Sequence, residues 1–144
     1  MKRHATAIWN GALADGRGSL TTQSGALDNH GYSFKARFED ESGKSGTNPE
    51  ELLAAAHAGC FAMQLSHFLA ENGTPADELK ARAVVAVEQA NGGFEVQSSK
   101  ITLEARVPGI EDAKFQELAE KAKAGCPISK ALGAIEVSLD AKLV

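Results

Sequence analysis

The longest apolar run in the chain covers residues 52–69 and predicts a buried central helix. Three helix-start signals precede it: Asn48 can cap the first turn, Pro49 suits the first helical position, and Glu51 has capping-box spacing. The run is apolar on nearly every side, as in a helix that is buried all round. Its polar interruptions are His57, Gln64, Ser66 and His67. Because of them the run is unsuited to span a bilayer, and we expect a core helix over residues 49–71.

Shorter segments before this helix predict a β-meander. Residues 4–9, 19–23 and 32–38 have the composition of strands, and turn residues separate them. The third segment, YSFKARF, alternates aromatic or small residues with polar ones, as a half-buried strand does. This alternation places Arg37 with Lys35 on the polar face, which in a strand is the solvated one.

A hairpin and two further helices are predicted after the central helix. Residues 80–89 and 94–107 read as strands around the turn Asn91-Gly92-Gly93. An amphipathic helix follows over residues 111–124, with Gly125 as its C-terminal cap. A short helix then begins at Cys126-Pro127.

The final segment, residues 134–144, alternates strictly and predicts an antiparallel strand with one solvated face. Strands, a buried helix, a hairpin, a helix pair and a strand make an α+β chain rather than a doubly wound one. A helix that is apolar on all sides needs a second covering layer, and a homodimer supplies one.

Composition places the chain among soluble globular proteins, with 43% hydrophobic and 24% charged residues. Its 144 residues suit one domain, residues 1–144. The formal net charge of −4 argues against a nucleic-acid partner. The start MKRHATAIWNG lacks the apolar core of a signal peptide, so we expect a cytoplasmic protein without a membrane anchor. Structural disulfides are rare in that compartment.

Two cysteines, Cys60 and Cys126, are the first candidates for chemistry. In a reducing compartment they are either inert core residues or a redox or metal pair. Cys126 lies at a predicted helix start, where the helix dipole lowers the pKa of a thiol. Cys60 lies about three turns into its helix, so a reactive Cys60 needs a separate cation. Arg37 lies in the predicted strand just before the central helix, and the other arginines lie elsewhere: Arg3, Arg17, Arg82 and Arg106.

His57 lies three residues before Cys60, on the same helical face. Two functional interpretations are open: a Cys–His dyad with Cys60, or a metal pair with His67. No third metal ligand is evident, and no metal is expected. We favour a core or interface histidine.

Two motifs resemble the OsmC/Ohr family of thiol peroxidases. They are GTNPEELLAAAHAGCFAMQLSHFLAENG, preceded by YSFKARFEDESGKS, and AGCPISKAL. The start AIWNGALADGRGSLTTQSGALDNHGYSF is similar to the OsmC branch, so the resemblance covers essentially the whole chain. It implies an intertwined α+β homodimer, in which antiparallel sheets wrap around two long central helices. It also implies thiol-dependent reduction of organic hydroperoxides, and of hydrogen peroxide less well.

The same resemblance implies roles for four residues. Cys60 matches the peroxidatic cysteine and Cys126 the resolving one, which forms a disulfide with the Cys60 sulfenic acid. Arg37 matches the arginine that favours the thiolate, and Glu50 the glutamate that holds this arginine. An external dithiol, with a lipoyl protein as one candidate, reduces the disulfide, and no cofactor is needed because sulfur carries both electrons.

The helix geometry adds a constraint on Glu50. On one continuous helix Glu50 and Cys60 are about 15 Å apart, so we expect the partner subunit to supply Glu50. Two alternatives to a peroxidase stay open. One is a non-catalytic dimeric stress protein that binds apolar ligands at its interface, and the other is a metal or thiol-hydrolase site using Cys60 and His57.

Overall fold

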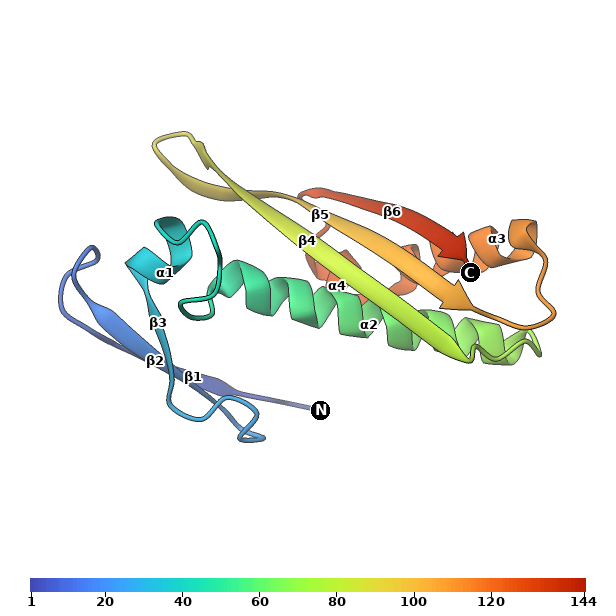
Figure 1. Ribbon diagram of the computed structural model, residues 1–144, viewed down its shortest axis with the longest axis horizontal. Coiled ribbons are helices and arrows are strands. Elements are labelled where there is room, and N and C mark those ends of the chain that lie inside the picture. The colour runs from blue at the N-terminus through green and yellow to red at the C-terminus, as the bar shows by residue number, and fades with distance from the viewer. The chain divides into compact units, whose positions relative to one another are not determined.

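The first 49 residues form a three-stranded antiparallel meander in the computed structural model, which describes residues 1–144 (Figure 1). Its strands are β1 (Ala5–Asn10), β2 (Arg17–Thr22) and β3 (His30–Ser33), in the order β1-β2-β3. Gly18 of β2 pairs with Trp9 on one side and Tyr32 on the other. The two rings meet with their centroids 5.3 Å apart, and a Cβ at Gly18 would collide with the Tyr32 ring. The predicted meander is confirmed.

The predicted strand over residues 32–38 is wrong in its second half. β3 ends at Ser33, and α1 (Phe34–Phe38) follows as a short helix. The Ser33 hydroxyl oxygen caps this helix by accepting the Ala36 backbone N–H at 3.1 Å. Phe34 and Phe38 are four residues apart, a spacing that fits both a strand face and a helix face, and their rings stack at 5.0 Å. The strand-parity argument for Arg37 therefore does not apply.

Asp40 organises the polar loop that follows α1. Its carboxylate accepts the backbone N–H groups of Ser42, Lys44 and Ser45 at 2.8–2.9 Å. It also accepts the Ser42 hydroxyl at 2.6 Å. These hydrogen bonds, led by that of the Ser42 side chain, hold the pKa of Asp40 well below its usual range. The loop therefore has a defined shape.

The second compact unit, Glu50–Val144, is built on α2 (Pro49–Glu71), which spans the residues predicted for the central helix. One stripe of α2 is buried, formed by His57, Phe61, Leu65 and Leu69. Its other side is open in the single chain, where Met63 is 78% exposed. By length and composition alone α2 could cross a membrane. Its buried stripe belongs to the core cluster, however, so α2 is a core helix.

The sheet of this unit has the order β4-β5-β6. β4 (Glu78–Ala90) and β5 (Gly93–Arg106) form the predicted antiparallel hairpin. β6 (Glu136–Leu143) pairs with β5 in parallel, so the prediction of an antiparallel last strand is wrong. The reason is the connection: α3 (Asp112–Gly125) and α4 (Pro127–Ala131) form a crossover between β5 and β6, as parallel strands require. Alternation along β6 reports one solvated face and not the strand direction.

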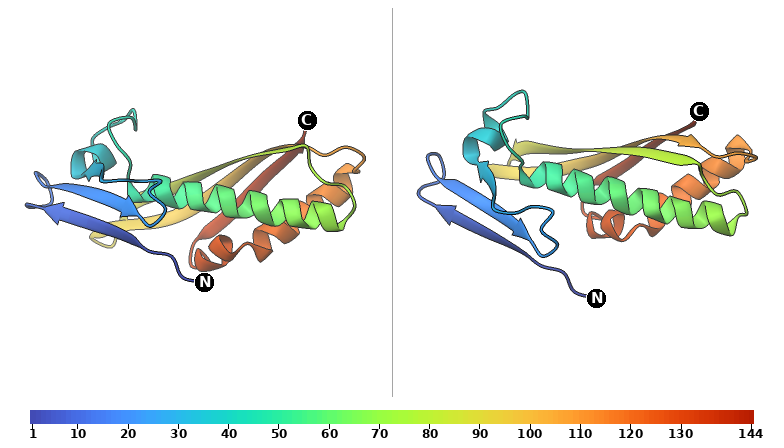
Figure 2. Two further views of the ribbon diagram at one scale, coloured as in Figure 1. Left: turned by 90° about the horizontal axis from the view of Figure 1, so that it is seen from below. Right: turned by 60° about the horizontal axis from the view of Figure 1, so that its bottom comes forward.

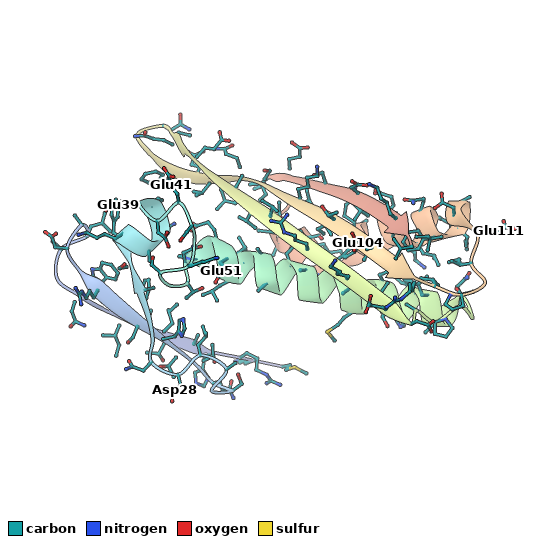
Figure 3. The ribbon with its side chains drawn as sticks, viewed as in Figure 1. Asp28, Glu39, Glu41, Glu51, Glu104 and Glu111 are labelled. Carbon is teal, nitrogen blue, oxygen red and sulfur yellow. The ribbon has the colours of Figure 1, made fainter.

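The core of this unit lies between one face of the sheet and the helices (Figure 2). Buried and exposed residues alternate along β5, and the buried ones pack with residues of α2 and α3. The inward side chains of β5 are Ser99, Ile101, Leu103 and Ala105. The opposite face of the sheet is charged, with Glu104 of β5 (Figure 3) bound by Lys80 at 2.9 Å. The helices therefore cover one face, and the charged face is solvated.

Candidate active site

The two cysteines meet inside the second unit. Cys60 comes from the middle of α2 and Cys126 from the junction of α3 and α4, and their Sγ atoms are 3.0 Å apart. Both are free thiols. The separation exceeds a disulfide bond by about 1 Å, so a small movement of the side chains closes the bond. Cys126 is fully buried whereas Cys60 is partly exposed. The pair is therefore close enough for redox chemistry and open from the side of Cys60.

Helix ends on both sides fix the position of Cys126. Its backbone N–H ends α3 by donating to the Ala122 carbonyl at 2.9 Å. Its sulfur then caps α4 by accepting the Ser129 backbone N–H at 3.5 Å, with Pro127 at the start of that helix. The predicted helix start at Cys126 is confirmed. The predicted cap at Gly125 is wrong by one residue, because Cys126 itself is the cap.

The environments of the two thiols shift their pKa values in opposite directions. Burial raises the pKa of Cys60, and the hydrogen bond with Cys126 raises it further. Burial acts in the same sense on Cys126, but hydrogen bonds from Cys60 and from the backbone and hydroxyl of Ser129 outweigh it and lower the pKa. Within this unit the negative charge is therefore favoured on Cys126, and Cys60 needs a cation from elsewhere, as predicted.

His57 lies one turn before Cys60 and is fully buried. Its Nδ1 is 2.7 Å from the Ser99 hydroxyl, and its Nε2 is 2.8 Å from the Ser129 hydroxyl. Burial lowers the pKa of His57, so the ring is neutral. The prediction of a core histidine is confirmed, and no Cys–His dyad forms because both ring nitrogens are engaged by serines.

Ser99 and Ser129 were not found by sequence reasoning. An isolated serine in a strand or in a short helix carries no signal by itself, and only the fold brings these two to His57. The alternative of a metal pair also fails. His67 is exposed and lies ten residues further along the same helix, so about 15 Å separates it from His57.

Arg37 belongs to the first unit, at the end of α1, where its guanidinium lies 4.7 Å from the centre of the Phe38 ring. It borders a cavity of about 220 Å³ whose other walls are largely apolar. The aromatic side chains of this cavity are Trp9, Tyr32, Phe34 and Phe38. The approach of Arg37 to Cys60 stays a prediction.

Glu50 lies in the first turn of α2, next to Glu51 (Figure 3). The helix continues without interruption to Cys60, so ten residues, or about 15 Å, separate the two along its axis. Glu50 and Cys60 of one chain therefore do not share a site. The structure brings Cys60 and Cys126 together and leaves the roles of Arg37 and Glu50 as predictions.

Comparison with known proteins extends along the whole chain. The sequence profile of a family described as OsmC-like protein matches residues 41–140. Peroxiredoxin OsmC of Escherichia coli (strain K12) is 42% identical over 137 residues, covering 95% of this chain and 93% of the relative. The crystal structure of the organic hydroperoxide resistance protein OhrB of Bacillus subtilis has a TM-score of 0.74 at 29% identity, covering 96% of this chain and 98% of that one. An organic hydroperoxide resistance protein from Elizabethkingia anophelis has a TM-score of 0.78 at 26% identity, with coverages of 100% and 99%.

Proposed function

Since this chain belongs to the OsmC family, we propose that it is a cysteine-based peroxidase that reduces organic hydroperoxides, and hydrogen peroxide less well. The observation that carries the proposal is the pair of free thiols, Cys60 and Cys126, with their sulfur atoms 3.0 Å apart. A second support is the name of the relatives, peroxiredoxin and organic hydroperoxide resistance protein. In this function residues 1–144 act as one OsmC-like domain.

In this proposal Cys60 is the peroxidatic residue, because it is the partly exposed residue of the pair. Its thiolate attacks the terminal oxygen of the hydroperoxide, the O–O bond breaks, and the alcohol leaves after taking up a proton. Cys60 then carries a sulfenic acid. The thiolate of Cys126 attacks that sulfur, a disulfide forms, and the hydroxide that departs is protonated to water.

An external dithiol returns the disulfide to two thiols by exchange and is itself oxidised to a disulfide. Two electrons pass from the dithiol through sulfur to the peroxide, so no cofactor enters the cycle. A lipoyl protein is one candidate for the dithiol. The cycle takes place in the cytoplasm, where such reductants are available.

Arg37 is the cation that Cys60 lacks within its own unit. A guanidinium beside the sulfur favours the thiolate by direct charge interaction, which offsets the effect of burial on Cys60. The cavity beside Arg37 is lined mainly by aromatic side chains and suits the hydrocarbon part of an organic hydroperoxide. This arrangement explains a preference for organic hydroperoxides over hydrogen peroxide.

The active form is a homodimer in which α2 helices from the two subunits pack together. Two features of α2 support this: Met63 is 78% exposed in the single chain, and nothing lies within 4 Å of a Cβ placed at Gly59. Glycine within a helix costs about 0.5–1 kcal/mol relative to alanine, and the single chain offers no packing reason for it. Close approach of a second helix supplies that reason. Antiparallel packing then lets the partner's Glu50 hold Arg37 at Cys60.

The proposal is tested by intact mass spectrometry of the reduced protein after one equivalent of cumene hydroperoxide. The expected product has lost two hydrogen atoms, and Cys126→Ser gains one oxygen atom instead. Cys60→Ser is the matched control and should remain unchanged. If the mass of the parent protein stays constant for minutes, the peroxidase proposal is wrong, and the alternative of a non-catalytic protein that binds apolar ligands is favoured.

A further inference from the structure

A chain of buried polar groups extends from β5 through α2 to the cysteine pair. It consists of Ser99, His57 and Ser129, linked by hydrogen bonds of 2.7 and 2.8 Å, and Ser129 in turn donates its backbone N–H to the Cys126 sulfur at 3.5 Å. His57 and Ser99 have no exposed surface, and Ser129 is 8% exposed. Buried polar groups of this kind are costly unless every partner is satisfied. Nothing in the catalytic cycle described above uses these three residues.

The direction of the hydrogen bonds in this chain follows from the chemistry of a neutral imidazole. Such a ring donates from one nitrogen and accepts at the other, and it can exchange the two roles. If Nε2 of His57 carries the proton, it donates to the Ser129 oxygen, and Ser99 donates to Nδ1. The Ser129 hydroxyl is then left to donate to the sulfur of Cys126.

In the opposite tautomer every hydrogen bond reverses. Nδ1 of His57 donates to Ser99, and the Ser129 hydroxyl donates to Nε2. The Ser129 oxygen can then accept a proton from the Cys126 thiol. The Ser129 hydroxyl can therefore accept from Cys126 as a thiol and donate to it as a thiolate, with no charge on His57 in either case.

We propose that His57 is a positioning residue for Cys126: with Ser99 it directs the Ser129 hydroxyl to the sulfur whenever that sulfur is a thiolate. This rests on the proposed function of the cysteine pair. It concerns the second half of the cycle, in which the Cys126 thiolate attacks the Cys60 sulfenic acid. The same hydrogen bond acts again when an external thiolate reduces the disulfide, because Cys126 then departs as a thiolate.

The fixed backbone of Cys126 strengthens this assignment. Its sulfur already accepts the Ser129 N–H at 3.5 Å, so the hydroxyl of the same residue is the group that can adjust. Burial raises the pKa of Cys126, but the hydrogen bond with Cys60 lowers it, and the Ser129 N–H and hydroxyl lower it further. Hydrogen bonds to a charged group are roughly twice as strong as those between neutral groups. Loss of the Ser129 hydroxyl should therefore destabilise the Cys126 thiolate more than the Cys126 thiol.

The test compares Ser129→Ala with Ser129→Thr, which keeps a hydroxyl. After a pulse of cumene hydroperoxide, the lifetime of the Cys60 sulfenic acid is measured by trapping it with dimedone at increasing delays. We expect disulfide closure to be about tenfold slower in Ser129→Ala and close to the parent rate in Ser129→Thr. Formation of the sulfenic acid should be equally fast in all three proteins.

Ser99→Ala is the matched control for a purely structural role. It removes an equally buried hydrogen bond from His57 without touching Cys126, so it should slow closure less than Ser129→Ala at a similar loss of stability. His57→Gln, whose amide exchanges its donor and acceptor ends only by rotating and not by moving a proton, should slow closure several-fold. If closure in Ser129→Ala and His57→Gln matches the parent, or follows the melting temperature alone, the inference is wrong.

A second readout separates this inference from the peroxidase proposal. In a Cys60→Ser background, the thiolate absorbance at 240 nm reports Cys126 without any peroxide. Adding Ser129→Ala should move its titration to higher pH, and adding Ser129→Thr should not. If no sulfenic acid forms in any protein, the peroxidase proposal fails while this titration still decides the role of Ser129. An unchanged titration with normal sulfenic acid formation overturns the inference alone.

Discussion

The sulfur atoms of Cys60 and Cys126 lie 3.0 Å apart although 66 residues separate them in sequence. The central helix supplies one cysteine and the crossover between two parallel strands supplies the other. Their surroundings differ: hydrogen bonds favour the thiolate of Cys126, whereas burial and the neighbouring sulfur favour the thiol of Cys60. When the pair loses one proton, Cys126 is thus the thiol that ionises, unless a cation stabilises the Cys60 thiolate.

Replacing Cys126 by serine should slow turnover and expose Cys60 to over-oxidation. Without a resolving sulfur, the Cys60 sulfenic acid lasts until an external thiol reduces it, and excess hydroperoxide oxidises part of it to the sulfinic acid. Consumption of cumene hydroperoxide in the presence of dithiothreitol and intact mass spectra check this together. Continued turnover of Cys126→Ser at the parent rate would show that disulfide formation with Cys126 is dispensable.

Arg37→Met should lower the second-order rate constant for cumene hydroperoxide by about 100-fold, because a neighbouring opposite charge lowers a thiol pKa by about one to three units. The melting temperature should hardly change, since Arg37 is exposed. Lys35→Met is the matched control, because it removes one positive charge from the same short helix. Equal losses in the two variants would assign the effect to net charge.

Gly59→Leu should convert the dimer into monomers, as measured by light scattering on a size-exclusion column. The single chain has open space at this position, and leucine is the better helix former, so the fold itself is retained. The control is Ala113→Leu, which enlarges an exposed residue of α3. A dimer that tolerates Gly59→Leu would place the interface away from this face of α2.

Stability should fall as the pH drops below about 6.5, and His57 should be a cause. Burial lowers the pKa of His57 below the value of about 6.5 of a solvated imidazole, so the unfolded chain binds the proton at higher pH than the folded one. Between about pH 6.5 and the lower pKa of His57 in the folded protein, the unfolded state binds more protons than the native state. The free energy of unfolding therefore falls by up to about 1.4 kcal/mol for each unit by which the pH drops.

Urea unfolding at pH 7.5, 6.5 and 5.5 measures this slope. His57→Gln should flatten it, whereas His67→Gln, at an exposed position of the same helix, should leave it in place. A slope that survives in His57→Gln would have to come from other groups. Asp40 is not one of them, because its carboxylate pKa is held well below its usual range and its contribution is lost only at much lower pH.

Most elements of the fold follow from local patterns in the sequence. Capping signals at Pro49 and the turn at Asn91-Gly92 define a helix start and a hairpin through short-range chemistry alone. Two of the errors have one physical cause: the periodicity of a segment shows which residues share a face, but not which strand or helix the segment packs against. Phe34 and Phe38 fit both periods, and the alternation along β6 is compatible with either strand direction.

For the site, the sequence identified both cysteines and the burial of His57. It also predicted that a helix start stabilises the Cys126 thiolate, whereas the Cys60 thiolate needs a cation. It could not provide Ser99 and Ser129, because hydrogen bonds across 42 and 72 residues exist only after the sheet and the crossover have formed. Arg37 was placed by family resemblance, and its strand parity was misread because a five-residue helix replaces the strand.

Cys60 is partly exposed and Cys126 is fully buried in the single chain, and this difference gives the proposed disulfide a direction. We expect an incoming thiolate to attack Cys60. Attack along the S–S axis would then expel the Cys126 sulfur, so the mixed disulfide with the reductant would form on α2 and Cys126 would serve as the leaving group. We therefore expect a mixed disulfide with the reductant to be found on Cys60 of α2, and not on Cys126 at the α3–α4 junction.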